Sequence, residues 1–289
     1  MRAIMEEYRQ QLRNRPDVVG LLAVTNQESY SPVIDGFDLL LFVVSDSDGQ
    51  IPSILHYSKD GYRIQERWST LAEIRSWLEG APHRDIVQWL LQGEILEDRD
   101  GCLRQLRERL GNFGDEMRER RLFYEFASFL KSYLQAKQYI QQGHYLDAYS
   151  NVLDALHHWA RIAIVEMGSH PELTVWRQLR QINPGVYKLY EELTHSSESL
   201  EQRLRLVLLA CEFSVMSKME RCCALLLRLL KSRETPWRAD ELRRHPELAG
   251  VDIDLNLVLG KLERKGLIRE VAVARDEWLT ALEIQYACR

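Results

Sequence analysis

The hydrophobic pattern divides the chain into three regions of different period. In residues 1–113, short apolar runs of strand length alternate with stretches of helical period, and the glycines of "GNFG" close the region. In residues 114–231 only the helical period remains, and residues 232–289 are short and mixed. This succession predicts an α+β fold with an α/β core, a helical bundle and a small C-terminal domain.

Strands and helices alternate in the first region. A helix is expected at about 3–14 and is followed by strands and two further helices. The expected strands are "VVGLLAVT" (18–25), "FDLLLFVV" (37–44) and "GYRIQERW" (61–68), and the expected helices are "LAEIRSWLE" (71–79) and "RDIVQWLLQG" (84–93).

Long helices fill the second region. They are expected at 120–143, 145–167 and 200–231, with a shorter one at 186–195, and "NPG" at 183–185 predicts a turn between them. In the helix 145–167 one continuous buried face is predicted at 3–4 spacing, made of Leu146, Tyr149, Leu153, Leu156, Ala160, Ala163 and Met167.

The third region has the order of a winged helix-turn-helix. "RADELRRH" (238–245) and "DIDLNLVLGKLERKG" (252–266) read as helices, and "LIREVAVA" (267–274) begins a β-ribbon. The second helix ends with Lys261, Arg264 and Lys265, which could contact the phosphates of DNA. Against DNA binding, Asp252 and Asp254 stand at the start of that helix, so a packing or protein-contact role is the alternative.

Composition narrows the class of protein. The chain has 289 residues, 45% hydrophobic and 28% charged, and a formal charge of −5, which is typical of a globular protein and unlike a general polyanion binder. No apolar run approaches the ~20 residues that span a bilayer, and the N-terminal residues lack a signal peptide's apolar stretch. The five cysteines form no CxxC pair, so we expect a reduced, cytoplasmic protein without membrane contact.

The stretch "VIDGFDLLLFVV" (33–44) carries the candidate chemistry, with Asp38 at the start of a strand. The region around it resembles the nucleotidyltransferase fold of DNA polymerase β and the aminoglycoside nucleotidyltransferases, in which a Gly-Ser turn precedes an Asp-x-Asp strand. "GEILEDRDGCLRQLRERL" is similar to the segment that ends many small cores of this fold. Through "DAYSNVLDALHHWARI", "VYKLYEELT" and the C-terminal module, the whole chain is similar to the nucleotidyltransferase-like YgxA proteins of Bacillus-type bacteria. This resemblance implies a fold more than a reaction.

The resemblance also sets a test for catalysis. Nucleotidyl transfer uses Mg²⁺ ions, held by carboxylates at i and i+2 on one strand face. Asp38 falls on the second aspartate of the motif and Gly36 on the first, so Asp38 would hold at most one Mg²⁺. Val24-Thr25 replaces Gly-Ser: Thr25 could offer a hydroxyl to a phosphate, but Val24 disfavours the backbone that glycine allows.

Further acidic residues are candidates for the remaining roles. Asp35 would face the other side of a regular strand, and its "DG" predicts a turn or a strand entry. Glu66 is the candidate third carboxylate, with a solvated glutamate on an edge strand as the alternative.

The helix 145–167 carries a polar stripe as well. It consists of Asp147, Asn151, Asp154, His158 and Arg161. By the resemblance, Asp147 or Asp154 would be a general base. The alternative is a solvated face with Asp154–His158 and His157–Arg161 pairs.

Three hypotheses follow for the function. The favoured one is a non-catalytic protein that binds a nucleoside triphosphate or a partner through a degenerate cleft at Thr25 and Asp38. The second is an active Mg²⁺-dependent nucleotidyltransferase that uses Asp38, Glu66 and Asp154 on an unknown acceptor. The third is a DNA-associated regulator that acts through Lys261, Arg264 and Lys265.

Overall fold

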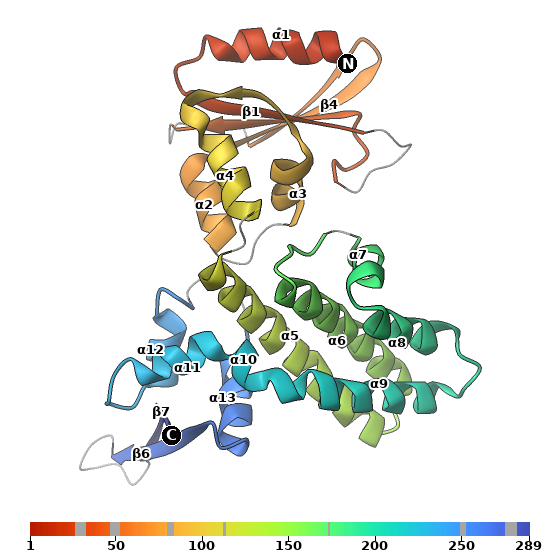
Figure 1. The fold of residues 1–289 in the computed structure, drawn as a ribbon, viewed down its shortest axis with the longest axis vertical. Coiled ribbons are helices and arrows are strands. Elements are labelled where there is room, and N and C mark those ends of the chain that lie inside the picture. The colour runs from red at the N-terminus through yellow and green to blue at the C-terminus, as the bar shows by residue number, and fades with distance from the viewer. Residues whose placement is uncertain are drawn as a thin grey trace. The chain divides into compact units, whose positions relative to one another are not determined.

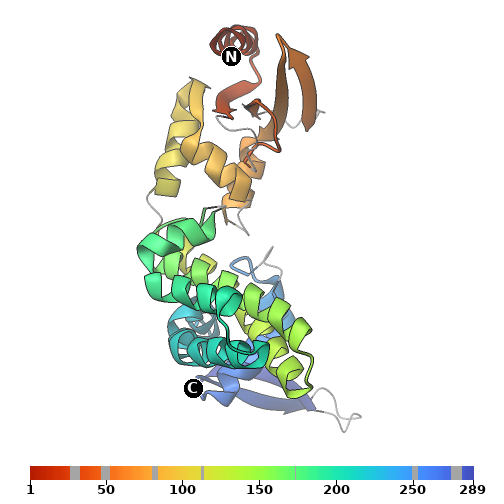
Figure 2. The same cartoon turned by 90° about the vertical axis from the view of Figure 1, so that its right-hand side faces the viewer.

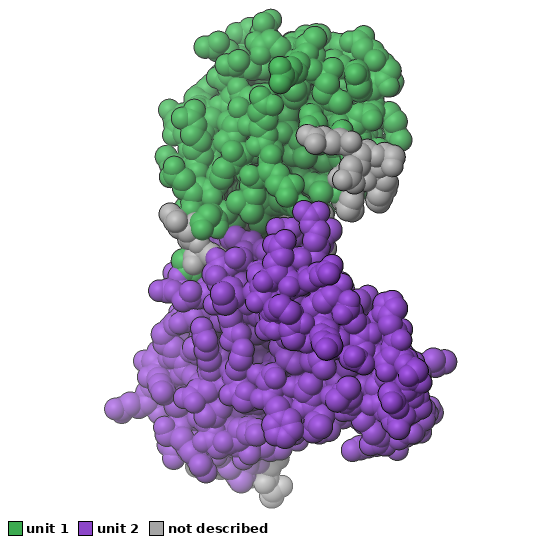
Figure 3. Space-filling view, turned by 45° about the vertical axis from the view of Figure 1, so that its right-hand side comes forward, with its two compact units in different colours: residues 1–114 green, residues 115–289 purple. Residues whose placement is uncertain are grey.

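A computed structural model describes residues 1–26, 33–46, 53–79, 84–111, 114–172, 174–248, 253–274 and 282–289. The chain forms two compact units, residues 1–114 and 115–289 (Figure 3). The further division of the second unit into a bundle and a domain over 232–289 stays a prediction.

The first unit is built on a five-stranded sheet in the order β3-β4-β2-β1-β5. Its strands are β1 (Val18–Thr25), β2 (Leu39–Ser45), β3 (Ile54–Lys59), β4 (Tyr62–Thr70) and β5 (Glu94–Asp98). The neighbouring strands β2 and β4 pair in parallel, whereas the other described pairs are antiparallel. Strand β2 is buried along its whole length, as expected for a central strand covered on both faces.

Helices cover both faces of this sheet (Figure 1). Helix α1 (Arg2–Arg13) packs on one face, where it meets Leu39, Leu41 and Val43 of β2. Helices α2 (Leu71–Glu79), α3 (Arg84–Gln92) and α4 (Cys102–Gly111) cover the other face, where side chains of these helices meet Leu40 and Phe42. Alternate residues of β2 therefore enter two separate cores.

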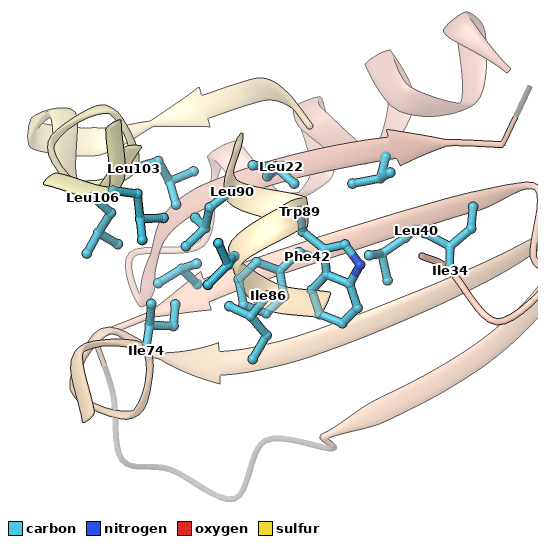
Figure 4. Packing of buried hydrophobic residues seen from close by; sticks show 14 residues of the cluster. Leu22, Ile34, Leu40, Phe42, Ile74, Ile86, Trp89, Leu90, Leu103 and Leu106 are labelled. Carbon is cyan, nitrogen blue, oxygen red and sulfur yellow. The ribbon is translucent and has the colours of Figure 1, made fainter. Parts of the chain in front are cut away.

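The core beneath α3 centres on Trp89 and Phe42, whose rings lie 5.5 Å apart between centroids (Figure 4). The Trp89 indole nitrogen donates to the backbone oxygen of Val33 at 2.6 Å, which joins α3 to the segment before β2. Gly93 ends α3 against β1, and a Cβ there would lie 2.3 Å from Leu22 Cδ2. Only glycine allows this close approach between the helix end and the strand.

The second unit is mainly helical, and α5 and α6 form an extensively packed antiparallel pair (Figure 2). Gly143, with a φ of 77°, lies in the turn between them. The remaining helices pack around this pair or continue into the C-terminal segment. The helices are α5 (Asp115–Gln141), α6 (Tyr145–Glu166), α7 (Val175–Ile182), α8 (Pro184–His195), α9 (Leu200–Ser214), η2 (Met216–Lys218), α10 (Met219–Cys222), α11 (Ala224–Lys231), α12 (Ala239–Arg244) and α13 (Leu255–Arg264).

Two expectations for this unit were wrong. The stretch 200–231 is not one helix but the succession α9, η2, α10 and α11. It is apolar on several sides, so its pattern could not show where the chain changes direction. In α6 the predicted buried face fails at both ends, because Leu146 is 79% exposed and Met167 is 68% exposed. The buried side begins instead at Ala148 and Val152.

The "NPG" turn is also the start of a helix. The Asn183 side chain accepts a hydrogen bond from the Val186 amide at 3.2 Å, and Pro184 takes the first helical position of α8. Both features are typical of a helix N-terminus.

The C-terminal segment ends in the antiparallel pair β6 (Ile268–Ala274) and β7 (Leu282–Cys288). Backbone hydrogen bonds of 2.7 and 2.8 Å also join Trp237 to Tyr286. Helix α13 packs against α5 as well as against β6. Within the described ranges, no helix combines the length and apolar character that crossing a bilayer requires.

Candidate functional site

Asp38 lies immediately before β2 and continues its pairing with β4. The Asp38 amide donates to the Arg63 oxygen at 2.9 Å, and the Arg63 amide donates to Asp38 Oδ2 at 2.7 Å. The carboxylate thus takes the place of a backbone acceptor in the ladder. This contact fixes the start of β2, and it engages one of the two oxygens that a metal ion would use.

Gly36, on the position of the missing aspartate, belongs to a tight turn. The Phe37 amide donates to the Ile34 oxygen at 2.9 Å, and Asp35 and Gly36 have φ values of 51° and 75°. Positive φ at both central residues is the signature of a type I′ turn, for which Asp-Gly is a preferred sequence. The prediction of a turn at "DG" is confirmed. A residue with a side chain at position 36 would have a strained backbone.

Strand β1 continues through the position of the family's Gly-Ser turn. Val24 is buried in the core under α3, and Thr25 pairs with Leu39 of β2. Thr25 is exposed at the end of the strand. Its side chain follows Leu21 and Ala23 toward the α1 face of the sheet, because side chains alternate along a strand.

Glu66 is buried on the α1 face of the sheet. It lies on β4 beside Leu41 of β2, is 5% exposed and accepts a hydrogen bond from the Trp68 indole nitrogen. Strand β4 has neighbours on both sides, so the alternative of a solvated glutamate on an edge strand was wrong. Glu66 also lies near Tyr57, whose pKa is raised by burial and by this carboxylate.

The three candidate carboxylates do not share one face. Asp38 precedes Leu39 and so falls on the side of Leu40, under α3, whereas Glu66 shares the α1 side with Leu41. Asp35, on the turn, is engaged by Arg67 at 3.0 Å. In the part of the chain that the structure describes, no group of three or more His, Cys, Asp or Glu side chains could hold a metal ion.

Basic and aromatic side chains surround Asp35 and Asp38, although none of them was among the residues predicted for a site. Arg67 pairs with Asp35 and lies 5.1 Å from the centre of the Trp89 ring, and Arg63 lies 4.9 Å from the Phe37 ring. Gln65 Nε2 lies 3.5 Å from Asp35 Oδ2. The alternation of Arg63, Gln65 and Arg67 in "YRIQERW" was the available signal, since it places all three on one side of β4.

The polar stripe on α6 divides into an exposed half and a buried half. Asp147 and Asp154 are exposed, whereas Arg161 is 6% exposed. His158 Nδ1 lies 2.7 Å from Glu125 Oε2 on α5, so its partner is Glu125 and the expected Asp154–His158 pair was wrong. The nitrogen Nε2 of His157 accepts from the Trp176 indole at 2.8 Å.

Glu125 is fully buried and holds three basic side chains. Arg121 lies 2.6 Å from its Oε1, and Arg161 lies 3.6 Å from its Oε2. Burial by itself would raise the pKa of Glu125, but Arg121, His158 and Arg161 outweigh burial and hold the pKa below its ordinary value. We call Arg121, Glu125, His158 and Arg161 the buried ionic cluster.

A cleft of about 330 Å³ lies between α5 and α9 in the same unit. Ile140, Leu208 and Leu209 supply apolar lining, and Lys137 and Glu212 form an ion pair of 3.3 Å in its wall. The Tyr133 hydroxyl donates to Glu212 at 2.8 Å, and this contact is the main cause that lowers the pKa of Glu212.

The three basic residues at the C-terminal end of α13 differ in how far they are exposed to solvent. Lys261 is partly buried, and burial together with the charges of Lys265, Lys137 and Arg264 lowers its pKa. Arg264 and Lys265 are exposed, and Arg264 Nε donates to the Gly260 oxygen at 3.0 Å. Asp254 caps α13 by accepting from the Leu257 amide, while Asp252 lies outside the described residues.

Comparison with known proteins gives this arrangement its class. A family model described as nucleotidyltransferase-like matches residues 1–118, and one described as a YgxA-like substrate binding domain matches residues 119–218. The two matches define a nucleotidyltransferase-like protein with a substrate-binding domain.

Two relatives that match nearly the whole chain identify the family more closely. The uncharacterized protein YgxA of Bacillus subtilis (strain 168) is 35% identical over 269 residues, covering 93% of this chain and 91% of that protein. The crystal structure of a nucleotidyltransferase-like protein from Exiguobacterium sibiricum 255-15 is 32% identical with a TM-score of 0.80, covering 99% of this chain and 97% of that one. The chain therefore belongs to the YgxA family of nucleotidyltransferase-like proteins.

Proposed function

We propose that the N-terminal unit binds a nucleoside triphosphate or a partner without transferring a nucleotide. The observation that carries this proposal is the divergence of Asp38 and Glu66, which follow opposite faces of the sheet. In a two-metal site the ions lie about 3.5–4 Å apart, so the carboxylates that hold them must lie on one side of the sheet. Carboxylates separated by a sheet cannot hold the same ion.

Three local features agree with this proposal. Asp38 accepts from the Arg63 backbone, Gly36 lies in a turn that disfavours an aspartate, and Val24 packs in the core. The charges near the turn also balance, because Arg67 is paired with Asp35. Any Mg²⁺ at Asp38 would be held weakly, because Asp38 would supply one carboxylate and the bound ligand would have to supply the other oxygens.

The test is thermal unfolding with each of the four nucleoside triphosphates, with and without Mg²⁺, followed by an assay of nucleotide consumption. A ligand at 100 times its dissociation constant stabilises the fold by about 2.7 kcal/mol. We expect stabilisation by at least one nucleotide and no consumption above the protein-free rate. Asp38→Asn is the matched variant, because an asparagine oxygen can still accept from Arg63. Consumption by the wild type that is lost in Asp38→Asn would overturn the proposal.

We propose further that residues 232–289 form a winged-helix-like domain whose second helix serves internal packing. The order α12, α13, β6 and β7, with Trp237 joined to Tyr286 of β7 by an isolated β-bridge, supports the winged-helix assignment. The packing role is supported by α13, which lies against α5 and keeps Lys261 partly buried.

DNA retention at several salt concentrations tests this second proposal. Phosphate contacts make protein–DNA binding strongly dependent on salt. We expect no salt-sensitive retention of a DNA duplex by the wild type. Retention that falls with salt and disappears when Lys261, Arg264 and Lys265 are changed together to alanine would assign a DNA partner instead.

A further inference from the structure

The buried ionic cluster contains more positive than negative charge. One carboxylate, Glu125, faces two arginines that are each more than nine-tenths buried, and His158 adds a third basic group. Arginine keeps its charge at any pH that proteins experience. A buried charge without a compensating partner is strongly unfavourable, so this imbalance requires an explanation.

Arg161 is the least satisfied member of the cluster. Its NH1 lies 3.5 Å from His158 Nδ1, but that nitrogen faces the Glu125 carboxylate at 2.7 Å. An ionised carboxylate only accepts hydrogen bonds, so Nδ1 carries a proton and cannot accept one from Arg161. Among the described residues, Arg161 therefore keeps one long ion pair, of 3.6 Å, to Glu125.

The Nε atoms of both arginines are also without partners. Arg121 Nε and Arg161 Nε are buried and find no acceptor among the residues that the structure describes. Buried polar atoms in proteins are paired in the great majority of cases. Glu125 Oε1 also makes no hydrogen bond of regular geometry, although Arg121 lies 2.6 Å from it. The cluster thus has two unpartnered guanidinium donors for this one acceptor, which indicates a missing acceptor group.

We propose that the buried ionic cluster is an anion site of the helical unit, and that it binds a phosphate group carried by the ligand of this domain. The planar guanidinium matches the oxygens of a phosphate, and two arginines can each donate in pairs. His158, whose side chain is 17% exposed, marks the side on which the cluster meets solvent. All four residues lie within 119–218, the part that matches a substrate-binding domain. The inference does not depend on whether the N-terminal unit is catalytic.

The alternative is a purely structural network that holds α5 against α6, and the two roles predict opposite effects. If the site awaits an anion, Arg161→Gln removes surplus charge, so its unfolding temperature in chloride buffer should equal or exceed that of the wild type. If the network is structural, the same change should lower the unfolding temperature. Arg161→Lys keeps the charge but loses the paired donors, and it should bind phosphate more weakly than the wild type.

The experiment is thermal unfolding of the full chain in inorganic phosphate, with chloride and acetate at equal ionic strength as references. We expect a saturable rise with phosphate for the wild type and about a tenfold or greater loss of affinity in Arg161→Gln. Arg205→Gln is the matched control, since Arg205 is an exposed arginine paired with Glu201 on α9. It should keep the full response.

Four results would overturn the proposal. The first is the absence of any saturable effect of phosphate on the wild type, and the second is an unchanged response in Arg161→Gln. The third is a lower unfolding temperature of Arg161→Gln in chloride buffer. The fourth is a response to acetate in place of phosphate, which would exclude the phosphate assignment.

Discussion

The two units of this protein differ in how their acidic and basic side chains are paired. In the N-terminal unit the acidic side chains near the sheet are engaged: Asp38 by a backbone amide, Asp35 by Arg67 and Glu66 by Trp68. In the helical unit the buried acid Glu125 contacts several basic groups. The unit that resembles a catalytic domain thus offers few unengaged acceptors for a metal ion. The unit that resembles a substrate-binding domain offers unengaged donors for an anion.

Removal of the Glu125 carboxylate should have the largest effect on this contrast between the two units. Glu125→Gln leaves Arg121 and Arg161 buried without a counter-charge, and it should lower the free energy of unfolding by about 3–5 kcal/mol. Urea denaturation at neutral pH measures the loss, and inorganic phosphate should restore part of it. Glu201→Gln, in a solvent-accessible pair with Arg205, should lower the free energy of unfolding far less, because water and salt screen exposed ion pairs. Equal effects of the two changes would contradict the excess of positive charge in the buried ionic cluster.

A smaller effect is expected from an acid of the N-terminal unit that is fully engaged. The Asp98 side chain is 1% exposed and accepts from the Leu103 and Arg104 amides at 2.9 and 3.1 Å, which caps α4. Asp98→Ala should lower the free energy of unfolding by about 2 kcal/mol, as for a lost helix cap. Asp98→Asn keeps one acceptor and should lose less. Chemical denaturation of both variants compares them, and an alanine variant as stable as the wild type would remove Asp98 from the capping role.

The pH dependence of stability should separate Glu125 from the other acids. The pKa of Glu125 is lowered in the folded protein, so its contribution is present above the ordinary value of 4.5 and is lost as the pH falls below that value toward the folded pKa. The stability difference between wild type and Glu125→Gln should therefore shrink below about pH 4.5, by at most about 1.4 kcal/mol per pH unit. Urea titrations between neutral pH and pH 3 measure the difference. A gap that widens on acidification would contradict the direction of the shift.

The smallest effect concerns the missing carboxylate of the N-terminal unit. Gly36→Asp would restore the family's aspartate in sequence, but the φ of 75° makes it cost about 1 kcal/mol. Gly36→Ala carries the same backbone strain without a carboxylate, and so it is the matched control. Thermal unfolding with and without Mg²⁺ should show no Mg²⁺-dependent gain in either variant. A gain confined to Gly36→Asp would show that the introduced carboxylate and Asp38 can share an ion after all.

Much of the fold could be predicted because its strongest patterns are local. Strand β1 and helix α2 occupy the residues that the pattern predicted, and both have clear apolar periods. Strand β3 was not predicted, since it is a partly exposed edge strand with little apolar alternation. The breaks after Ser214 were hidden for a different reason. The run is apolar on several faces, and tertiary packing decides where such a run bends.

The candidate sites were harder to predict, because they depend on partners distant in sequence. The polar stripe on α6 includes His158 and Arg161, yet nothing local in the sequence indicates that Glu125, on α5, is their common partner. Whether Asp38 and Glu66 lie on the same face of the sheet likewise depends on the register between β2 and β4. The sequence of one strand alone does not determine that register. The turn at Gly36, in contrast, could be predicted from the sequence, since "DG" is typical of a tight turn.

The backbone pairing of Trp237 with Tyr286 has a consequence for the order in which the chain can fold during synthesis. The five strands of the first sheet are complete once Asp98 has been made, so this unit has all its partners early. Trp237, in contrast, must wait for β7, which follows α12, α13 and β6 along the chain. Folding from the N-terminus therefore leaves the C-terminal segment as the last to close. Until then, helix α13 can pack on α5 without its finished sheet.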